Sequence, residues 1–323
     1  MKMSYKIQIV LMATALMTFN TASVAQEWPN KPIRLVAPQP AGGGPERTIR
    51  AIAKGLTERL GQSVVVDYKP GADGNIGAAN VANSPPDGYT WMLSAEHVST
   101  INPFIYKNIG YDPQKLVATY LVGSLNQILA CHPKTGINNF ADFIRVANAN
   151  KAKPLTYASP GPNGYLGMEM LLDELKIDMT QVPYRGPAPA MQDLLGGQVD
   201  CALIVTAAML ENVRSKRVVG VATTSQTRIA AVPEVPTLRE VGFPNVEGNF
   251  WLAMYAPRGT PKAILDKFNK ALDETVRGVE VTEALAANNT IFSGAGPDTA
   301  QAEMAKSALK WERIVKRVKL TVD

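Results

Sequence analysis

Short apolar runs alternate with longer amphipathic stretches along this chain, and that alternation restricts its fold more than any other feature. Residues Ile33–Ala37 have the pattern of a buried strand, and the apolar residues from Ile49 to Leu60 recur at helical spacing until Gly61 ends the pattern. Strands that alternate with helices need crossover connections. We therefore expect an α/β fold with mostly parallel sheets that helices cover on both faces.

The same patterns locate the other main elements. Further strands are predicted at Val64–Tyr68, Thr90–Ala95, Ile128–His132, Leu155–Ser159, Asp200–Val205, Val218–Thr223 and Trp251–Ala256. Helices are predicted at Phe140–Ala149, Tyr165–Leu175, Ala188–Leu195, Lys262–Val276 and Asp298–Lys319. The length suggests two domains, and without a linker between them the chain is expected to cross from one to the other more than once.

The first 25 residues have the three-part pattern of a secretory signal peptide. Lys2 and Lys6 precede the apolar run Ile7–Phe19, and small residues lead to Ala25. The apolar run is shorter than the roughly 20 residues that cross a bilayer, which disfavours a membrane anchor. No cysteine near Ala25 could carry a lipid. We expect cleavage near Ala25 and an unanchored protein in the periplasm.

The charge balance argues against a nucleic-acid partner. The chain has 33 Lys and Arg residues against 28 Asp and Glu residues, a formal charge of +5. Two of these lysines belong to the predicted signal, so 31 basic and 28 acidic residues remain, a net charge of +3. The basic residues are spread along the chain and form no stripe that could neutralise phosphates.

No catalytic or metal-binding motif is visible in the sequence. The chain has two histidines, and it lacks G-x-S-x-G, H-E-x-x-H, C-x-x-C and EF-hand patterns. His132 stands at a strand end and is interpreted as structural, whereas His97 is expected in a loop where it could contact a ligand. Cys131 and Cys201 could form a disulfide in an oxidising compartment or remain separate buried thiols. The sequence predicts no metal and no cofactor.

Glycine-rich loops are the stronger functional feature. Ala41–Pro45 joins the first strand to the first helix, so its backbone N–H groups and the helix dipole could meet an anion. Ser159–Gly164 stands in the same position in the other half of the chain. Gly71–Gly77 lacks the G-x-G spacing of a dinucleotide loop, and tight turns explain its glycines equally well. Two strand-to-helix loops would form a cleft for one small ligand, with no reacting group.

Ordered motifs across almost the whole remaining chain resemble one known family, the Bug or TctC solute-binding proteins of tripartite tricarboxylate transport systems. The matching segments are Trp28–Arg34, Pro38–Arg50, Pro70–Gly77, Pro86–Thr90, Ile101–Pro103, Tyr157–Ser159, Val182–Gly186, Leu194–Asp200, Val232–Thr237 and Ala256–Pro261. The resemblance implies a two-lobed periplasmic-binding-protein fold of type II, the Venus-flytrap fold. Each lobe would hold a mostly parallel sheet flanked by helices, with two crossovers. Lobe 1 would comprise residues 26–125 and 250–323, and lobe 2 residues 126–249.

The resemblance also implies a function. The protein would bind a small organic acid between its lobes, close around it, and deliver it to the membrane subunits of a tripartite transporter. The ligand would bear a carboxylate and could be an aromatic, amide or amino acid. Signalling to a sensor kinase ectodomain is the alternative partner role, and an exported enzyme that uses the same cleft is a less favoured alternative. The protein is expected to be a monomer.

The ligand-binding residues that the resemblance implies come from three loops and one strand end. They are Gln39, Ala41, Gly42, Gly43, Gly44, Pro45, Glu46, Ser94, Ala95, Glu96, Ser159, Pro160, Gly161, Asn163, Gly164, Tyr165, Ile204 and Val205. Family members hold a ligand carboxylate largely through backbone groups and waters at the first loop and the Ser159 loop.

The chain departs from the family pattern in places that bear on the ligand. Pro45 and Glu46 stand where a small hydroxyl residue and Asp are usual, the Ser159 loop is shortened, and Ile204 replaces a common Asp. The site should therefore be less polar on the lobe 2 side. We interpret Glu96 as a solvated loop carboxylate, but if it and Glu46 lie near the cleft they should disfavour di- and tricarboxylates. The resulting hypothesis is a ligand with one carboxylate and an apolar, aromatic or amino portion, which Tyr165 would suit.

Overall fold

The computed structural model describes residues 27–41, 45–150, 152–244, 246, 249–318 and 320. The predicted signal peptide lies outside the described residues, and so do Gly42, Gly43 and Gly44 of the first loop. No helix among the described residues has both the length and the apolar character needed to cross a membrane.

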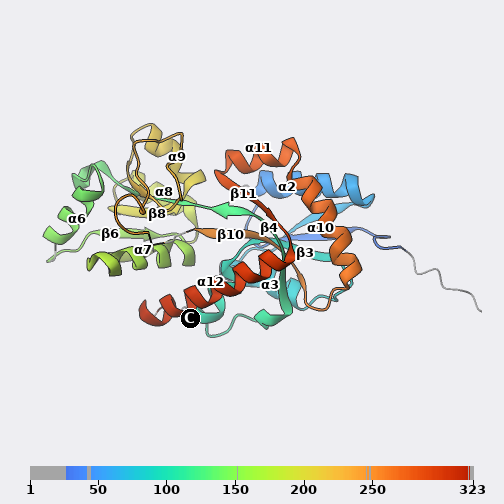
Figure 1. Ribbon diagram of the computed structural model, residues 1–323. Helices are drawn as coiled ribbons and strands as arrows, with labels where there is room; N and C mark the ends of the chain where they lie inside the picture. Colours follow the sequence, from blue (N-terminus) through green and yellow to red (C-terminus); the bar gives the residue numbers. More distant parts are fainter. Residues whose placement is uncertain are drawn as a thin grey trace, which may run out of the picture.

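A six-stranded sheet, which we call the first sheet, occupies one half of the molecule (Figure 1). Apolar residues cover both of its faces in two separate core clusters. Its strands, in spatial order, are β11 (Thr290–Ala295), β4 (Leu116–Leu125), β10 (Phe250–Pro257), β3 (Thr90–Ala95), β1 (Ile33–Ala37) and β2 (Val64–Tyr68). The main helices packed around it are α2 (Pro45–Leu60), α3 (Asn75–Ala82), α10 (Lys262–Val276) and α11 (Val279–Ala287).

A five-stranded sheet, the second sheet, occupies the other half and also has an apolar cluster on each face. Its strands, in spatial order, are β7 (Thr180–Pro183), β6 (Thr156–Ser159), β8 (Cys201–Val205), β5 (Gln127–Cys131) and β9 (Val219–Thr223). Its helices are α6 (Phe140–Ala149), α7 (Pro162–Leu175), α8 (Pro187–Leu195) and α9 (Thr206–Arg214). The α/β architecture with two helix-flanked sheets, as predicted from the sequence, is confirmed.

Both sheets are mixed in strand direction. Strand β1 pairs in parallel with β2 and β3, and β6 pairs in parallel with β7 and β8. The pairs β10–β3, β10–β4, β11–β4, β5–β8 and β5–β9 are antiparallel. The expectation of mostly parallel strands therefore holds only for part of each sheet. Strands β4 and β10, which carry the chain between the sheets, run in opposite directions, and their pairing with each other is therefore antiparallel.

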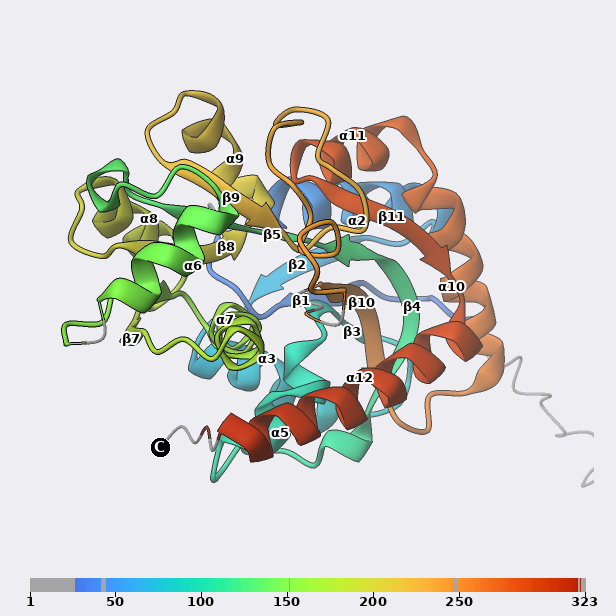
Figure 2. The same cartoon turned by 60° about the vertical axis from the view of Figure 1, so that its left-hand side comes forward.

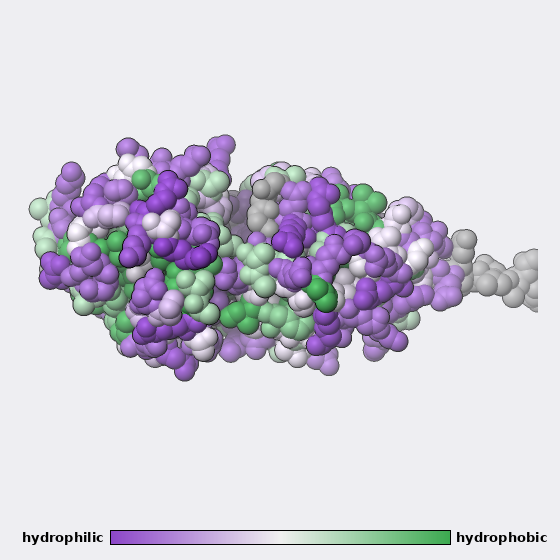
Figure 3. All heavy atoms as spheres, turned by 90° about the horizontal axis from the view of Figure 1, so that it is seen from above, coloured by the Kyte–Doolittle hydropathy of each residue, from purple (hydrophilic) through white to green (hydrophobic). Residues whose placement is uncertain are grey.

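Two of these strands form the connection between the halves. Strand β4 leads through Asn126 directly into β5, and Asn249 leads back into β10. The two crossings lie side by side, because Leu125 is paired with Phe250. Seen from above, the surface is hollowed where the two halves meet (Figure 3).

A long C-terminal helix, α12 (Pro297–Val318), contacts both halves. Figure 2 shows it running from beside β4 toward α5 (Asn102–Ile105) and α7. Trp311 and Ile314 are buried in the same core cluster as Leu171 of α7. Arg317 also forms an ion pair with Asp173 of α7, with Nη1 and Oδ2 3.0 Å apart. The helix therefore links the first sheet to the second in addition to the two crossing strands.

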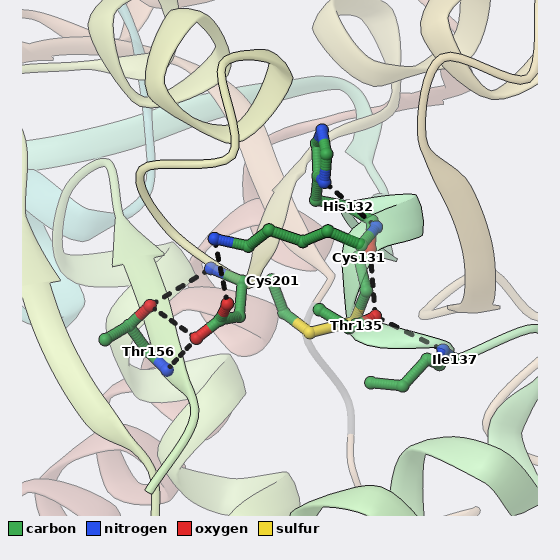
Figure 4. Close-up of a disulfide and its surroundings, with 8 residues drawn as sticks. Cys131, His132, Thr135, Ile137, Thr156 and Cys201 are labelled. Atoms are coloured by element: carbon green, nitrogen blue, oxygen red, sulfur yellow. Dashed lines mark hydrogen bonds and ion pairs between the residues drawn. A yellow bond between two sulfur atoms is a disulfide. The ribbon is translucent and has the colours of Figure 1, made fainter. Parts of the chain in front are cut away.

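Cys131 and Cys201 form a disulfide between β5 and β8 (Figure 4). The two residues stand directly opposite each other in the antiparallel pair, and both are fully buried. This arrangement resolves the alternatives that the sequence left open. Next to it, burial opposes ionisation of Asp200, but hydrogen bonds from Thr156 and Lys134 hold its pKa below the usual value.

Candidate functional site

The first loop leaves β1 at Ala37 and enters α2 at Pro45. Among its described residues Gln39 is half-buried and Ala41 is exposed. Pro38 packs on Gly77, where an added Cβ would lie 2.8 Å from the proline Cβ. A side chain at Gly77 would displace Pro38. The Gly71–Gly77 segment therefore packs directly against the start of the first loop.

The turn in this segment has an unusual backbone. Asp73 has φ 47° and Gly74 has φ 85°, both in the left-handed region. The Asp73 carbonyl accepts a hydrogen bond from Asn102 Nδ2 at 2.9 Å and lies 3.1 Å from His97 Nε2. Tyr106 donates its hydroxyl to the Asp73 carboxylate at 2.5 Å. Three neighbouring side chains thus hold the turn in place.

His97 belongs to the short helix α4 (His97–Thr100), not to a loop as the sequence suggested. Burial lowers the pKa of its imidazole. The neutral ring can donate from Nε2 to the Asp73 carbonyl and so supports the turn.

Glu46 lies in the first turn of α2, and its charge is compensated. Its Oε1 accepts hydrogen bonds from Arg50 Nε at 2.6 Å and from the Tyr68 hydroxyl at 3.2 Å. Arg50 also lies over the Tyr68 ring, 5.8 Å from its centroid. Beside the first loop, Glu46 therefore forms an ion pair and is not an isolated negative charge.

Ser94, Ala95 and Glu96 follow one another at the end of β3. The interpretation of Glu96 as a solvated carboxylate is wrong, because its side chain is 0% exposed. Its backbone N–H donates to the Trp251 carbonyl, and its Oε1 accepts from Trp311 Nε1 at 3.4 Å. Burial raises the pKa of Glu96 to about 7, and hydrogen bonds and the charge of Lys310 only partly oppose that shift. Helix α12 covers this carboxyl group and secludes it from solvent.

The second-half loop runs from the end of β6 into α7. Ser159 is buried, Pro160 and Gly161 are half-buried, and Gly161 has φ 140° just before the helix. An added Cβ at Gly164 would lie 2.9 Å from the carbonyl oxygen of Leu203, so this glycine lets the first turn of α7 rest on β8. Asn163 and Tyr165 flank that contact and are half-buried. Burial raises the pKa of the Tyr165 hydroxyl.

The two β8 residues predicted for the site differ in burial. Ile204 is fully buried and packs in the core cluster that includes Met209 and Ala190. Val205 is half-buried and stands at the start of α9. Val205 is thus the more accessible of the two side chains.

The sequence interpretation overlooked two amide residues at the crossing between the sheets. Asn126 and Gln127 are 4% and 2% exposed, and neither Asn126 Oδ1 nor Gln127 Oε1 has a hydrogen-bond partner among the described residues. The sequence does carry a signal for these residues, because two consecutive amides stand in the mostly apolar segment from Leu121 to Ala130. Elsewhere in the described ranges, no three His, Cys, Asp or Glu side chains gather as metal ligands would.

Two helix-flanked sheets are joined by adjacent crossing strands, and each half has a strand-to-helix loop at the end of a parallel strand. This architecture is typical of two-lobed solute-binding proteins. A family model described as "Tripartite tricarboxylate transporter family receptor" matches residues 48–320. The chain belongs to this family, as the resemblance implied.

Individual relatives agree with that assignment. BugT from Bordetella pertussis is 30% identical over 295 residues, which cover 90% of this chain and 90% of BugT. The periplasmic binding protein BugD has a TM-score of 0.80 and 31% identity, with coverage of 91% of this chain and 99% of BugD.

Two solved structures of similar fold contain dicarboxylates. Rpa4515 from R. palustris, solved with adipate, has a TM-score of 0.82 and 28% identity over 91% of this chain and 99% of its own. MatC from Rhodopseudomonas palustris, solved with malate, has a TM-score of 0.79 and 26% identity over 89% of this chain and 100% of its own.

Proposed function

We propose that this protein captures a small organic carboxylate in the periplasm and delivers it to the membrane subunits of a tripartite transporter. The family assignment is the observation that carries the proposal, since the family is one of transporter receptors. Adipate in Rpa4515 and malate in MatC support a carboxylate as the ligand class. The name of BugD as a periplasmic binding protein supports export.

The ligand would lie between the first loop, the β3 end and the Ser159 loop. The lobes would comprise residues 26–125 with 250–323, and 126–249, with α12 spanning both. A ligand that contacts both lobes favours the closed state by its differential affinity, and Asn126 and Asn249 at the adjacent crossings would absorb the rotation. This mechanism is binding followed by transfer, without chemical turnover.

Dicarboxylates belong to the proposed ligand class. The sequence would disfavour dicarboxylates only if Glu46 and Glu96 placed uncompensated negative charges near the ligand. Glu46 is instead paired with Arg50, and Glu96 is buried with its pKa raised to about 7. Neither carboxyl group therefore presents a free charge that would repel a second ligand carboxylate.

Calorimetry on the refolded, ligand-stripped protein tests this function. The titrants are citrate, succinate, malate, adipate, aromatic monocarboxylates and amino acids. We expect micromolar or tighter binding of at least one carboxylate, with a smaller radius of gyration in solution scattering. The ligand should be recovered chemically unchanged after prolonged incubation. Failure of every carboxylate to bind would contradict the proposal, and recovery of a converted product would favour an enzyme.

A separate measurement tests export. Periplasmic extracts of cells that express the full chain should contain a mature form beginning near Gln26. Retention of residues 1–25 on a protein found only in the cytoplasm would contradict this part of the proposal.

A further inference from the structure

Besides Asn126, two amide side chains of the second half have buried oxygens that accept no hydrogen bond within the described part of the chain. Gln127 is 2% exposed, and its Oε1 has no hydrogen-bond partner among the described residues. The Oδ1 of Asn163 is likewise buried and unpartnered within the described part of the chain. A buried acceptor without a donor costs free energy, so each of these groups calls for an explanation.

Both amides belong to the same face of the second sheet. Side chains alternate along a strand, so Gln127 shares the face of Leu129 and Cys131, whose core cluster includes residues of α6 and α7. Leu129 is paired with Leu203, and the Leu203 carbonyl lies against Gly164 in the first turn of α7. The first turn of α7, with Asn163, therefore lies over the β5–β8 pair close to the strand end that holds Gln127.

The main chain of Gln127 is already fully engaged. Its N–H donates to the Thr224 hydroxyl at 2.9 Å, and its carbonyl accepts from the Thr223 hydroxyl at 3.0 Å and from the Thr224 N–H at 3.0 Å. These bonds fix the backbone where the chain enters the second sheet. The side-chain amide has no part in them, and an apolar side chain of similar size would fill the same space without an unpaired oxygen.

We propose that Gln127 accepts a hydrogen bond from a hydroxyl or amino group that the ligand carries next to its carboxylate, and that Asn163 accepts a second one where this group is an amino group. This inference rests on the proposed function and narrows its ligand class to hydroxy acids and amino acids. The carboxylate would bind at the loops, and the neighbouring group would face the two amide oxygens. An ammonium group can donate to both of them, whereas a hydroxyl group has one hydrogen and donates to Gln127. A ligand that lacks the donor leaves both acceptors unpaired. Sites of this kind bind the donor-bearing ligand much more tightly than the analogue without the donor.

Calorimetry with matched acids tests the proposal. Each set differs only by H, OH or NH₃⁺ on the carbon next to a carboxylate: succinate, malate and aspartate; glutarate, 2-hydroxyglutarate and glutamate; 3-phenylpropionate, phenyllactate and phenylalanine. In the set that binds best, we expect the donor-bearing acid to bind about ten to one hundred times more tightly than its unsubstituted analogue.

The variants Gln127→Leu and Gln127→Met should lower that ratio to below about threefold, while the affinity for the unsubstituted acid changes little. Two apolar replacements of different shape are used so that the test does not depend on a single variant that fails to fold. Thermal unfolding shows whether each variant is folded. Gln181→Leu, at an exposed glutamine of the edge strand β7, is the matched control and should keep the wild-type ratio.

Three outcomes overturn the inference. The wild-type protein could bind all members of a set equally. The Gln127 variants could keep the wild-type ratio, which would leave the amide without a role in selection. They could also weaken all members alike, which would place the amide at the shared carboxylate. If the wild-type protein binds none of these acids nor any other carboxylate, the proposed function itself fails, and that result is distinct from the three above.

Discussion

The Glu96 carboxyl group accepts a hydrogen bond from the indole of Trp311, with Oε1 and Nε1 3.4 Å apart in the interior of the molecule. This contact joins the end of β3 to α12, 215 residues later in the chain. The same helix reaches α7 through the ion pair between Arg317 and Asp173. Helix α12 thus contacts both the β3 end and the helix that follows the Ser159 loop.

The buried Glu96 predicts a specific pH dependence of stability. Its pKa is about 7 in the folded protein, against 4.5 for an ordinary glutamate. Between these values the folded protein holds a proton that the unfolded chain releases. The free energy of unfolding should therefore fall as the pH rises through this window, by on the order of 3 kcal/mol, and then stay level above it.

Glu96→Gln should remove this contribution. In urea unfolding at pH 5 and pH 8, the variant should gain stability relative to the wild-type protein at pH 8. Glu234→Gln, at an exposed glutamate, is the control and should follow the wild-type protein at both pH values. Parallel stability curves for wild type and Glu96→Gln would show that Glu96 is ionised at pH 5 already.

The sequence predicted elements best where local signals mark their ends. The predicted bounds Phe140–Ala149 and Lys262–Val276 match α6 and α10 as observed. The side chain of Asn139 caps the first of these helices by accepting from the Asp142 N–H, and Pro261 precedes the second. These signals lie within a few residues of the helix and need no tertiary context.

Elements and contacts that depend on distant segments were missed. Strands β7 and β11 are edge strands with exposed residues, and Leu116–Leu125 is an apolar run whose period does not separate strand from helix. The local sequence indicates a solvated Glu96, because the helix that buries this residue begins only at Pro297. The sequence does not decide between a disulfide and two free thiols, because the strand register that sets Cys131 opposite Cys201 depends on the tertiary structure.

The disulfide should stabilise the second half of the molecule. It closes a loop with a sequence separation of 70 residues, and such a link restricts the unfolded chain. The double variant Cys131→Ala/Cys201→Ala should lose about 2 to 4 kcal/mol of unfolding free energy, measured in urea under oxidising conditions. A reducing agent should bring the wild-type midpoint to that of the variant and leave the variant unchanged. Equal midpoints in the oxidised state would refute this prediction.

Gly164 should be required for the position of the Ser159 loop. In Gly164→Ala the new Cβ would meet the Leu203 carbonyl at 2.9 Å and push the first turn of α7 away from β8. We expect a loss of about 1 to 3 kcal/mol in stability, with weaker carboxylate binding in calorimetry. Gly196→Ala is the control, because its Cβ would lie 3.4 Å from the nearest atom and its φ is −80°. Similar behaviour of the two variants would rule out a special role for the contact.

The pair of Glu46 and Arg50 should set the charge that a ligand meets at the first loop. Arg50→Gln leaves the Glu46 carboxylate without the guanidinium 2.6 Å away, so carboxylate affinity should fall by about threefold to tenfold. The double variant Arg50→Gln/Glu46→Gln carries neither charge and should recover most of the affinity.

Two comparisons separate this effect from a general loss of positive charge. Arg47→Gln removes a charge from the same helix, at a residue whose partner is Glu283, and should have little effect. The loss in Arg50→Gln should also shrink as salt is raised from 50 mM to 500 mM, because exposed charges are screened. If Arg50→Gln binds carboxylates as tightly as the wild-type protein at low salt, Glu46 lies too far from the ligand to influence it. The choice of ligand would then be determined by the other loops.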